Sequence, residues 1–216
     1  MGYFGRITAD LGSRKMGETL FFIPAISGLP PELAAVLACL PIANVNGTLF
    51  GELARSPELA KEVDFACVLA VDPFYDGLRL ADELMLAGVK GIANYPFLGF
   101  LREGVFDAMS DSGFNFTREL NCLATAKKRG MKVAAFVCTL SQGLAALDIG
   151  SDLVILAQGI TQDEVARISD NELAEIVSVL RNHADDNHRI LFYETRRHQK
   201  SCVRVGSYVD GMVYGP

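Results

Sequence analysis

The chain has 216 residues, of which 50% are hydrophobic and 21% are charged, and its formal net charge is −6. A chain of this length buries roughly 70% of its surface on folding, so one substantial hydrophobic core can form. The composition excludes a disordered chain, a collagen-like repeat and a disulfide-stapled scaffold. The acidic balance also argues against nucleic acid as a partner, because phosphate binding needs clustered Lys and Arg.

The sequence predicts a cytoplasmic protein with no membrane partner. Its five cysteines are odd in number and lack metal-ligand spacing, as in reduced intracellular thiols. The first residues contain no apolar signal sequence or lipidation motif. Leu33–Gly51 carries no charge, but Pro41, Asn44, Asn46 and Gly47 interrupt it, so a buried helix running into a buried strand is expected there.

Short apolar runs alternate with segments of helical periodicity along the whole chain, which is typical of parallel βα units. The runs are apolar on both faces, as in strands covered by helices. Eight strands are predicted, and they span Thr19–Ala25, Ile42–Asn46, Phe65–Asp72, Val89–Asn94, Lys132–Cys138, Leu153–Gln158, Arg189–Glu194 and Val209–Tyr214.

Helix signals lie between these runs. Pro31 predicts a helix start, and Gly130 predicts the end of a helix with an apolar stripe from Phe116 onwards. Ser169 and Glu172 have the spacing of a capping box. Eight βα units favour a compact (β/α)₈ TIM barrel, of the α/β class, in one domain over 1–216. An open doubly wound sheet is disfavoured because no glycine-rich phosphate loop follows the first predicted strand.

The two ends of the chain carry a further expectation. Residues 1–18 are expected to form a helical or capping segment, and the chain stops soon after the eighth predicted strand, without a normal eighth helix. Either Phe4–Lys15 or a second copy of the chain must then cover the flank between strands eight and one. The sequence therefore predicts a homo-oligomer.

The catalytic groups of a TIM barrel follow the carboxyl ends of its strands. Two acids occupy such positions, Asp72 and Glu194. Both close odd-numbered predicted strands, so inward-facing carboxylates would meet across the mouth of the barrel. There they could bind a divalent cation or act as acid and base. The alternatives are that Asp72 only starts a turn at Pro73 and that Glu194 only pairs with Arg196.

Neutral and basic residues complete the predicted site. Asn46, Asn94 and Gln158 close other strands and are predicted to position a substrate through hydrogen bonds. Arg196 and Ser207, which lie between the seventh and eighth predicted strands, are predicted to bind the anionic group of the substrate, although a solvated loop is the alternative. No Lys or His closes a strand, which argues against a Schiff-base enzyme and a zinc site.

Four segments resemble the phosphoenolpyruvate hydrolase-like family of TIM-barrel proteins, and they occur in the family's order: Ala70–Phe74, Gly88–Gly99, Ser112–Phe116 and Gly150–Ile155. The resemblance implies a hydrolase or lyase of the phosphoenolpyruvate-utilising type that acts on a small anionic or phosphorylated carbonyl compound, with Mg²⁺. Asp72 and Asn94 match the family's strand-three Asp and strand-four Asn.

Three departures from the family leave a second function open. The family's Arg- and Gly-rich loop after strand two is reduced here to Asn46–Gly51. Gln158-Gly159-Ile160 stands where the family has His-Met-Gly, and Glu194-Thr195-Arg196 stands where it has His-Gly-Gly. An imidazole can move a proton near neutral pH, whereas an amide cannot. The second function is a non-catalytic metabolite-binding or regulatory barrel derived from such an enzyme.

Overall fold

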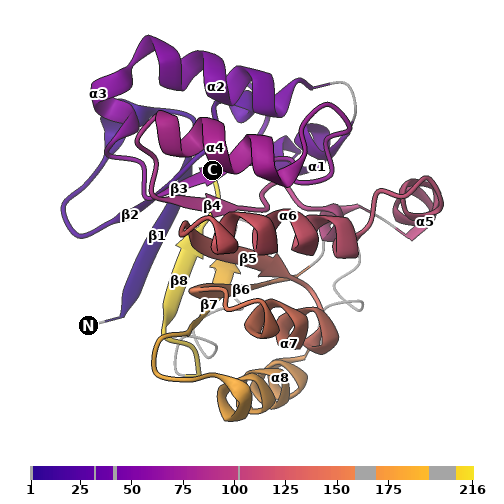
Figure 1. The fold of residues 1–216 in the computed structure, drawn as a ribbon. Coiled ribbons are helices and arrows are strands. Elements are labelled where there is room, and N and C mark those ends of the chain that lie inside the picture. The colour runs from indigo at the N-terminus through magenta and orange to yellow at the C-terminus, as the bar shows by residue number, and fades with distance from the viewer. Residues whose placement is uncertain (1, 32, 41–42, 102, 159–168, 195–207) are drawn as a thin grey trace.

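The structure is a computed structural model that describes residues 2–31, 33–40, 43–101, 103–158, 169–194 and 208–216. Its parallel strands form a closed barrel in which each strand pairs with the next and β8 returns to β1 (Figure 1). The strands are β1 (Tyr3–Thr8), β2 (Thr19–Phe22), β3 (Phe65–Cys67), β4 (Gly91–Ala93), β5 (Lys132–Val137), β6 (Leu153–Ala157), β7 (Arg189–Glu194) and β8 (Gly211–Tyr214).

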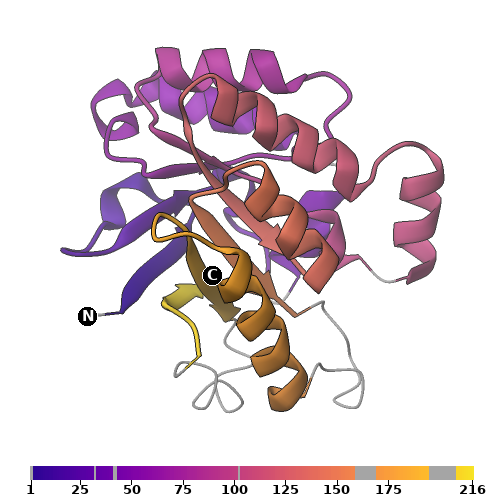
Figure 2. The same ribbon diagram turned by 60° about the horizontal axis from the view of Figure 1, so that its bottom comes forward.

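Helices surround much of the barrel, and one of them, α5, projects to one side (Figures 1 and 2). The α-helices are α1 (Ala34–Cys39), α2 (Val45–Arg55), α3 (Pro57–Ala60), α4 (Gly77–Leu86), α5 (Glu103–Asp111), α6 (Phe116–Lys128), α7 (Leu140–Asp148) and α8 (Asp170–His183). The described residues also form three short 3₁₀ helices, which are η1 (Leu11–Ser13), η2 (Pro24–Ile26) and η3 (Leu98–Phe100). The capping box is confirmed: Ser169 and Glu172 exchange their hydrogen bonds at the start of α8.

The predicted barrel is therefore confirmed, but two of its predicted parts were wrong. The described residues of the expected strand Ile42–Asn46 do not form a strand, because Asn44 accepts a hydrogen bond from Gly47 N and starts α2 there. Residues 1–18, expected to be helical, contain β1 instead. Strand β1 fits there because Gly5 lets it approach β2, where a Cβ would lie 2.9 Å from the Phe21 ring. The two errors cancel in the strand count.

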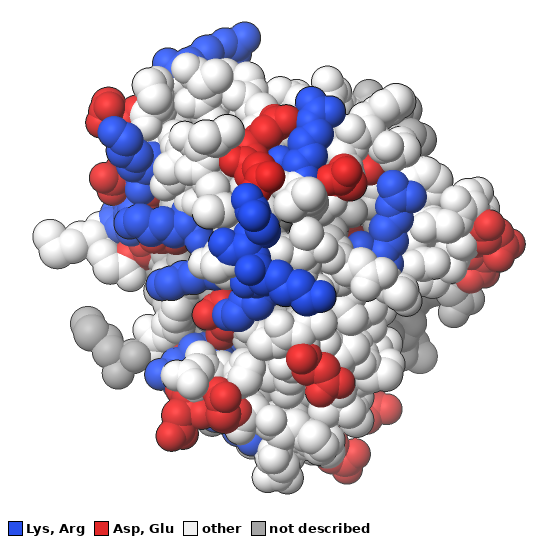
Figure 3. Space-filling model, viewed as in Figure 1, with Lys and Arg blue, Asp and Glu red and all other residues white. Residues whose placement is uncertain are grey.

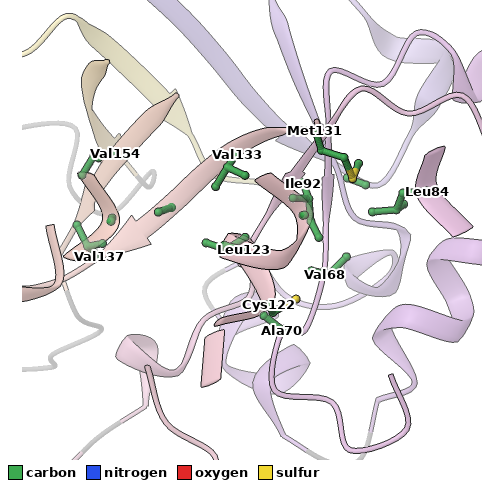
Figure 4. Packing of buried hydrophobic residues seen from close by; sticks show 14 of the residues in the cluster. Val68, Ala70, Leu84, Ile92, Cys122, Leu123, Met131, Val133, Val137 and Val154 are labelled. Atoms are coloured by element: carbon green, nitrogen blue, oxygen red, sulfur yellow. The ribbon is translucent and has the colours of Figure 1, made fainter. Parts of the chain in front are cut away.

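Alternation along the strands divides the core into two layers. The outer layer packs against the helices and includes Val68, Ile92 and Val133, together with Leu84 of α4 and Leu123 of α6 (Figure 4). The inner layer fills the barrel and continues into η2, α1 and η3 at its carboxyl end. Strand residues of the inner layer include Ile7, Phe21, Phe65, Cys67, Ala93, Phe136, Ile155, Leu191, Tyr193 and Val213.

The same pair of interactions, a hydrogen bond and a salt bridge made by one Asp, recurs at the amino end of the barrel. An Asp stands just before β3, β6 and β8, and each accepts a backbone N–H from the preceding strand at 2.8–2.9 Å. Each carboxylate also pairs with a basic side chain at 2.8–3.1 Å. The pairs are Asp64 with Arg14, Asp152 with Lys127, and Asp210 with Arg181. This end of the barrel is thus built for stability.

The face of the molecule in Figure 3 carries charges of both signs. Lys and Arg gather at the centre of the face that carries α4 and α6, with acids beside them (Figure 3). Salt bridges between Arg129 and Asp82 and between Lys127 and Asp152 are part of this pattern. The four described cysteines are free thiols. In the described parts of the chain, no helix has the length and apolar character needed to span a membrane.

Candidate functional site

A largely apolar cavity of about 540 Å³ lies at the end of the β3 segment, which comprises β3 and the residues that follow it as far as Asp72. This is within the size range of ligand pockets in proteins. Asp72 is the only acid among its described lining residues. These are Cys39, Ala43, Asn44, Leu69, Val71, Asp72, Pro73, Phe74, Tyr75, Met109 and Phe114.

The Asp72 carboxylate is fixed by two hydrogen bonds. Its Oδ1 accepts Phe74 N at 2.9 Å, and its Oδ2 accepts Asn46 Nδ2 at 3.0 Å. The first bond is the turn contact that the sequence offered as an alternative role. An ionised carboxylate has about four acceptor positions, so this arrangement still leaves acceptor capacity for a ligand. The structure therefore places Asp72 in a turn and in a cavity at once.

Asn46 does not face the cavity, although it was predicted to position a substrate. Its side chain is 0% exposed and lies in the first turn of α2. Its Oδ1 accepts Leu69 N at 3.0 Å, and its Nδ2 donates to Leu69 O at 3.1 Å as well as to Asp72. Asn46 therefore joins α2 to the β3 segment and holds the carboxylate of Asp72.

Asn94 forms the same kind of clamp on the next strand and is also 0% exposed. Its Oδ1 accepts Phe136 N at 2.7 Å, and its Nδ2 donates to Phe136 O and to Glu119 Oε2, both at 3.2 Å. Alternation explains this position, because Ala93 and Tyr95 point into the barrel and Asn94 points out toward α6. Asn94 is therefore a buried structural residue, and it does not line the cavity.

Glu119 is a buried acid that the sequence did not single out. It is 0% exposed, and its Oε1 accepts Leu98 N at 2.9 Å. Burial raises its pKa to about 8, although the hydrogen bonds from Leu98 and Asn94 oppose that rise. Glu119 thus fastens η3, which forms part of the cover at the carboxyl end of the barrel. A Glu in the first turn of an otherwise amphipathic helix looks like a surface residue, so no local pattern indicates that Glu119 is buried.

Glu194 and Gln158 do not line this cavity. Glu194 closes β7 and is 6% exposed, and its neighbour Tyr193 belongs to the inner layer. Alternation therefore turns the side chain of Glu194 away from the barrel interior. The structure does not bring Asp72 and Glu194 together in the cavity. Arg196 and Ser207 lie outside the described residues.

Aromatic side chains fill the barrel where the two carboxylates were expected to meet. Tyr95 and Tyr193 point inward from opposite sides, and their hydroxyl oxygens lie 3.0 Å apart. Their rings contact Phe100 and Phe136, and all of these side chains are buried. Burial raises the pKa of both tyrosines, so they remain neutral phenols.

Arg118 is a second residue that the sequence did not single out. It lies in the first turn of α6, and its Nη2 donates to the carbonyl oxygen of Asp72 at 3.3 Å. The guanidinium carbon lies 5.4 Å from the centre of the Phe114 ring. Arg118 therefore contacts two residues that line the cavity. Its position depends on the packing of α6 against the β3 segment, which no local pattern reveals.

The described residues contain no group of three His, Cys, Asp or Glu side chains placed to bind one metal ion. Mg²⁺ does not require such a cage, because it is commonly held by one or two carboxylates together with water and substrate oxygens. Asp72 has the oxygen chemistry and the free acceptor capacity for that role. The cavity thus fits a magnesium ion that binds together with an anionic ligand.

Comparison with known sequences gives a consistent picture. A family model described as phosphoenolpyruvate hydrolase-like matches residues 32–191. The uncharacterized protein y4oT of Sinorhizobium fredii is 30% identical over 156 residues, which cover 72% of this chain and 78% of that protein. The ToMV resistance protein Tm-1 of Solanum lycopersicum is 24% identical over 153 residues, 70% of this chain but only 20% of the tomato protein.

Solved structures show the same barrel. A putative lyase/mutase from Burkholderia cenocepacia superposes with a TM-score of 0.62 and 14% identity, covering 99% of this chain and 76% of that one. A phosphonopyruvate hydrolase in complex with oxalate and Mg²⁺ superposes with a TM-score of 0.56 and 14% identity, covering 99% and 75%. At these identities the likeness concerns the fold.

Proposed function

Because the chain belongs to the phosphoenolpyruvate hydrolase-like family, we propose that it is an enzyme that cleaves a small anionic carbonyl compound, as a hydrolase or lyase. The observation that carries the proposal is the carboxylate of Asp72, which is held by Asn46 and Phe74 N inside the cavity at the end of the β3 segment. The carboxyl end of the strands is where TIM barrels place their chemistry.

In this proposal Asp72 contacts the substrate and accepts or returns a proton. Asn46 is a positioning residue, since its bonds to Leu69 fix the amide that holds Asp72 Oδ2. The apolar wall of the cavity excludes water from the reacting groups. In the alternative role Asp72 would instead hold Mg²⁺, which is present in the solved phosphonopyruvate hydrolase of the same fold. When bound, the ion would polarise the carbonyl oxygen as a Lewis acid.

The test is turnover of phosphoenolpyruvate, phosphonopyruvate and a 2,3-dialkylmalate with added Mg²⁺, followed by proton NMR of the 2-oxo acid released. We expect Asp72→Asn to lower the rate by roughly 10²- to 10⁴-fold, the usual contribution of a positioned acid or base. Asp107→Asn, an exposed change on α5, is the matched control and leaves the rate unchanged.

Equal rates for wild type and Asp72→Asn would contradict the assignment of the site. A compound that binds the wild type with Mg²⁺ and is recovered chemically intact would favour the non-catalytic barrel instead. Asn46→Ala separates the positioning role: it should lower the turnover rate while the circular-dichroism spectrum keeps its helical signal.

A further inference from the structure

Arg118 differs from most other described arginines because no described carboxylate pairs with it. Arg6, Arg14, Arg55, Arg79, Arg129 and Arg181 each form a salt bridge. The guanidinium of Arg118 makes one hydrogen bond within the described residues, to the carbonyl oxygen of Asp72. A guanidinium has five N–H donors, so most of its donors are left for another acceptor.

The guanidinium of Arg118 is partly removed from water by its neighbours. The residue is half-buried, and its guanidinium lies between the backbone of Asp72 and the ring of Phe114. Both of these neighbours line the cavity, so Arg118 lies at its edge, although Arg118 is not itself a lining residue. A cation that has lost part of its water and has no counter-charge binds an anion strongly, and arginine does so through two parallel N–H···O bonds.

The walls of the cavity indicate what the rest of the ligand is like. Leu69, Val71, Phe74, Met109 and Phe114 supply apolar surface, and the volume is about 540 Å³. A three-carbon acid such as pyruvate would leave most of this surface in contact with water. A ligand with an apolar branch would cover it, at a gain of about 0.8 kcal/mol for each buried CH₂.

We propose that Arg118 binds the carboxylate of the substrate, and that this substrate is a 2-oxo or 2-hydroxy acid with an apolar branch. The carboxylate then lies beside Asp72, and the branch lies against Phe74, Met109 and Phe114. This inference rests on the proposed function of the same cavity, whose chemistry it narrows to branched acids.

Isothermal titration with three probes separates charge from apolar contact. The probes are 4-methyl-2-oxopentanoate, its uncharged amide and pyruvate. We expect the branched acid to bind the wild type at least about tenfold more tightly than pyruvate, because three more carbon atoms are buried. Arg118→Gln should weaken binding of the branched acid by roughly 10- to 100-fold, as expected for a lost charge-assisted pair, and leave the amide unchanged.

Two further variants keep the result interpretable. Arg118→Lys retains the charge without the planar fork, so it should restore only part of the affinity. Arg55→Gln, on the exposed side of α2, is the control and should not change binding. Circular dichroism confirms that the variants are folded.

The inference is overturned if Arg118→Gln binds the branched acid as tightly as wild type does, or if pyruvate binds as tightly as the branched acid. It is also overturned if the branched acid does not bind the wild type at millimolar concentration. Loss of turnover in Asp72→Asn would still support the proposed function in each of these cases, so the two failures can be told apart.

Discussion

At the residue scale, the same hydrogen-bonding arrangement of an asparagine side chain occurs twice in the described chain. Asn46 and Asn94 each pair their amide with both polar groups of one residue's backbone, and each gives the remaining N–H to a carboxylate. The carboxylates are Asp72, which lines the cavity, and Glu119, which is buried. An amide suits this task because it carries both a donor and an acceptor. Each asparagine, one in α2 and one after β4, therefore holds neighbouring segments together.

Glu119 should make the stability of the fold depend on pH. Burial raises its pKa from 4.5 to about 8, so the folded state keeps a proton that the unfolded state releases. The contribution of Glu119 to the free energy of unfolding is then greatest below about pH 4.5 and falls as the pH rises toward 8. Each unit of pKa difference corresponds to about 1.4 kcal/mol. Glu119→Gln, which imitates the neutral acid, should lose less stability than wild type between pH 6 and 9.

Urea unfolding at several pH values measures this difference. Glu175→Gln, an exposed change on α8, serves as the control and should follow the wild type. Parallel curves for wild type and Glu119→Gln across this pH range would show that Glu119 does not carry the pH dependence.

At the element scale, α2 and β1 show how packing decides whether a short segment becomes a helix or a strand. Val45, Leu49 and Leu53 repeat every four residues and are buried against the barrel, which makes residues 45–55 a helix despite Gly47 and Gly51. Strand β1 is held by partners on both sides, β2 and β8. Its weak local pattern matters less than those two ladders of hydrogen bonds.

The seam between β1 and β8 should be sensitive to one small change. Gly211 begins β8 and lies so close to Tyr3 that a Cβ would overlap the backbone of Tyr3. We expect Gly211→Ala to push the strands apart and to speed amide exchange in β1 and β8, while β5 and β6 stay protected. Hydrogen–deuterium exchange with mass spectrometry resolves these segments.

Gly51→Ala is the matched control, because a Cβ at that position has open space around it. Unchanged exchange at the seam in Gly211→Ala, or equal acceleration in all strands, would contradict a local opening at this seam.

At the scale of the whole molecule, the sector of β1 and β8 has little helical cover in the described residues (Figures 1 and 2). Phe4 points outward from β1, is 44% exposed and contacts the ring of Tyr214 at 5.1 Å. The N-terminal segment does not cover this flank as a helix, because it forms part of the barrel wall. Self-association, the other expectation from the sequence, stays a prediction.

Light scattering coupled to size-exclusion chromatography tests it over a range of protein concentrations. We expect an oligomer that Phe4→Glu shifts toward the monomer, since a buried charge without a partner weakens an interface. Leu86→Glu, on the exposed face of α4, should leave the mass unchanged. A wild-type protein that stays monomeric at every concentration would contradict self-association.

The sequence by itself determined the barrel and the place of Asp72. Runs that are apolar on both faces, helix signals between them and an acid after Val71 are local features, and the fold preserves them. The family resemblance, carried by motifs near strand ends, is confirmed by the family model that matches residues 32–191.

Only the tertiary structure decided which polar residues reach the cavity. Whether a strand-end residue faces the barrel or the helices depends on the alternation of its strand, and shifting the pattern by one residue reverses the answer. Asn94 and Glu194 follow inward-facing residues and so point outward. Arg118 lies 46 residues along the chain from Asp72, and only the packing of α6 brings it against Asp72 and Phe114, which line the cavity.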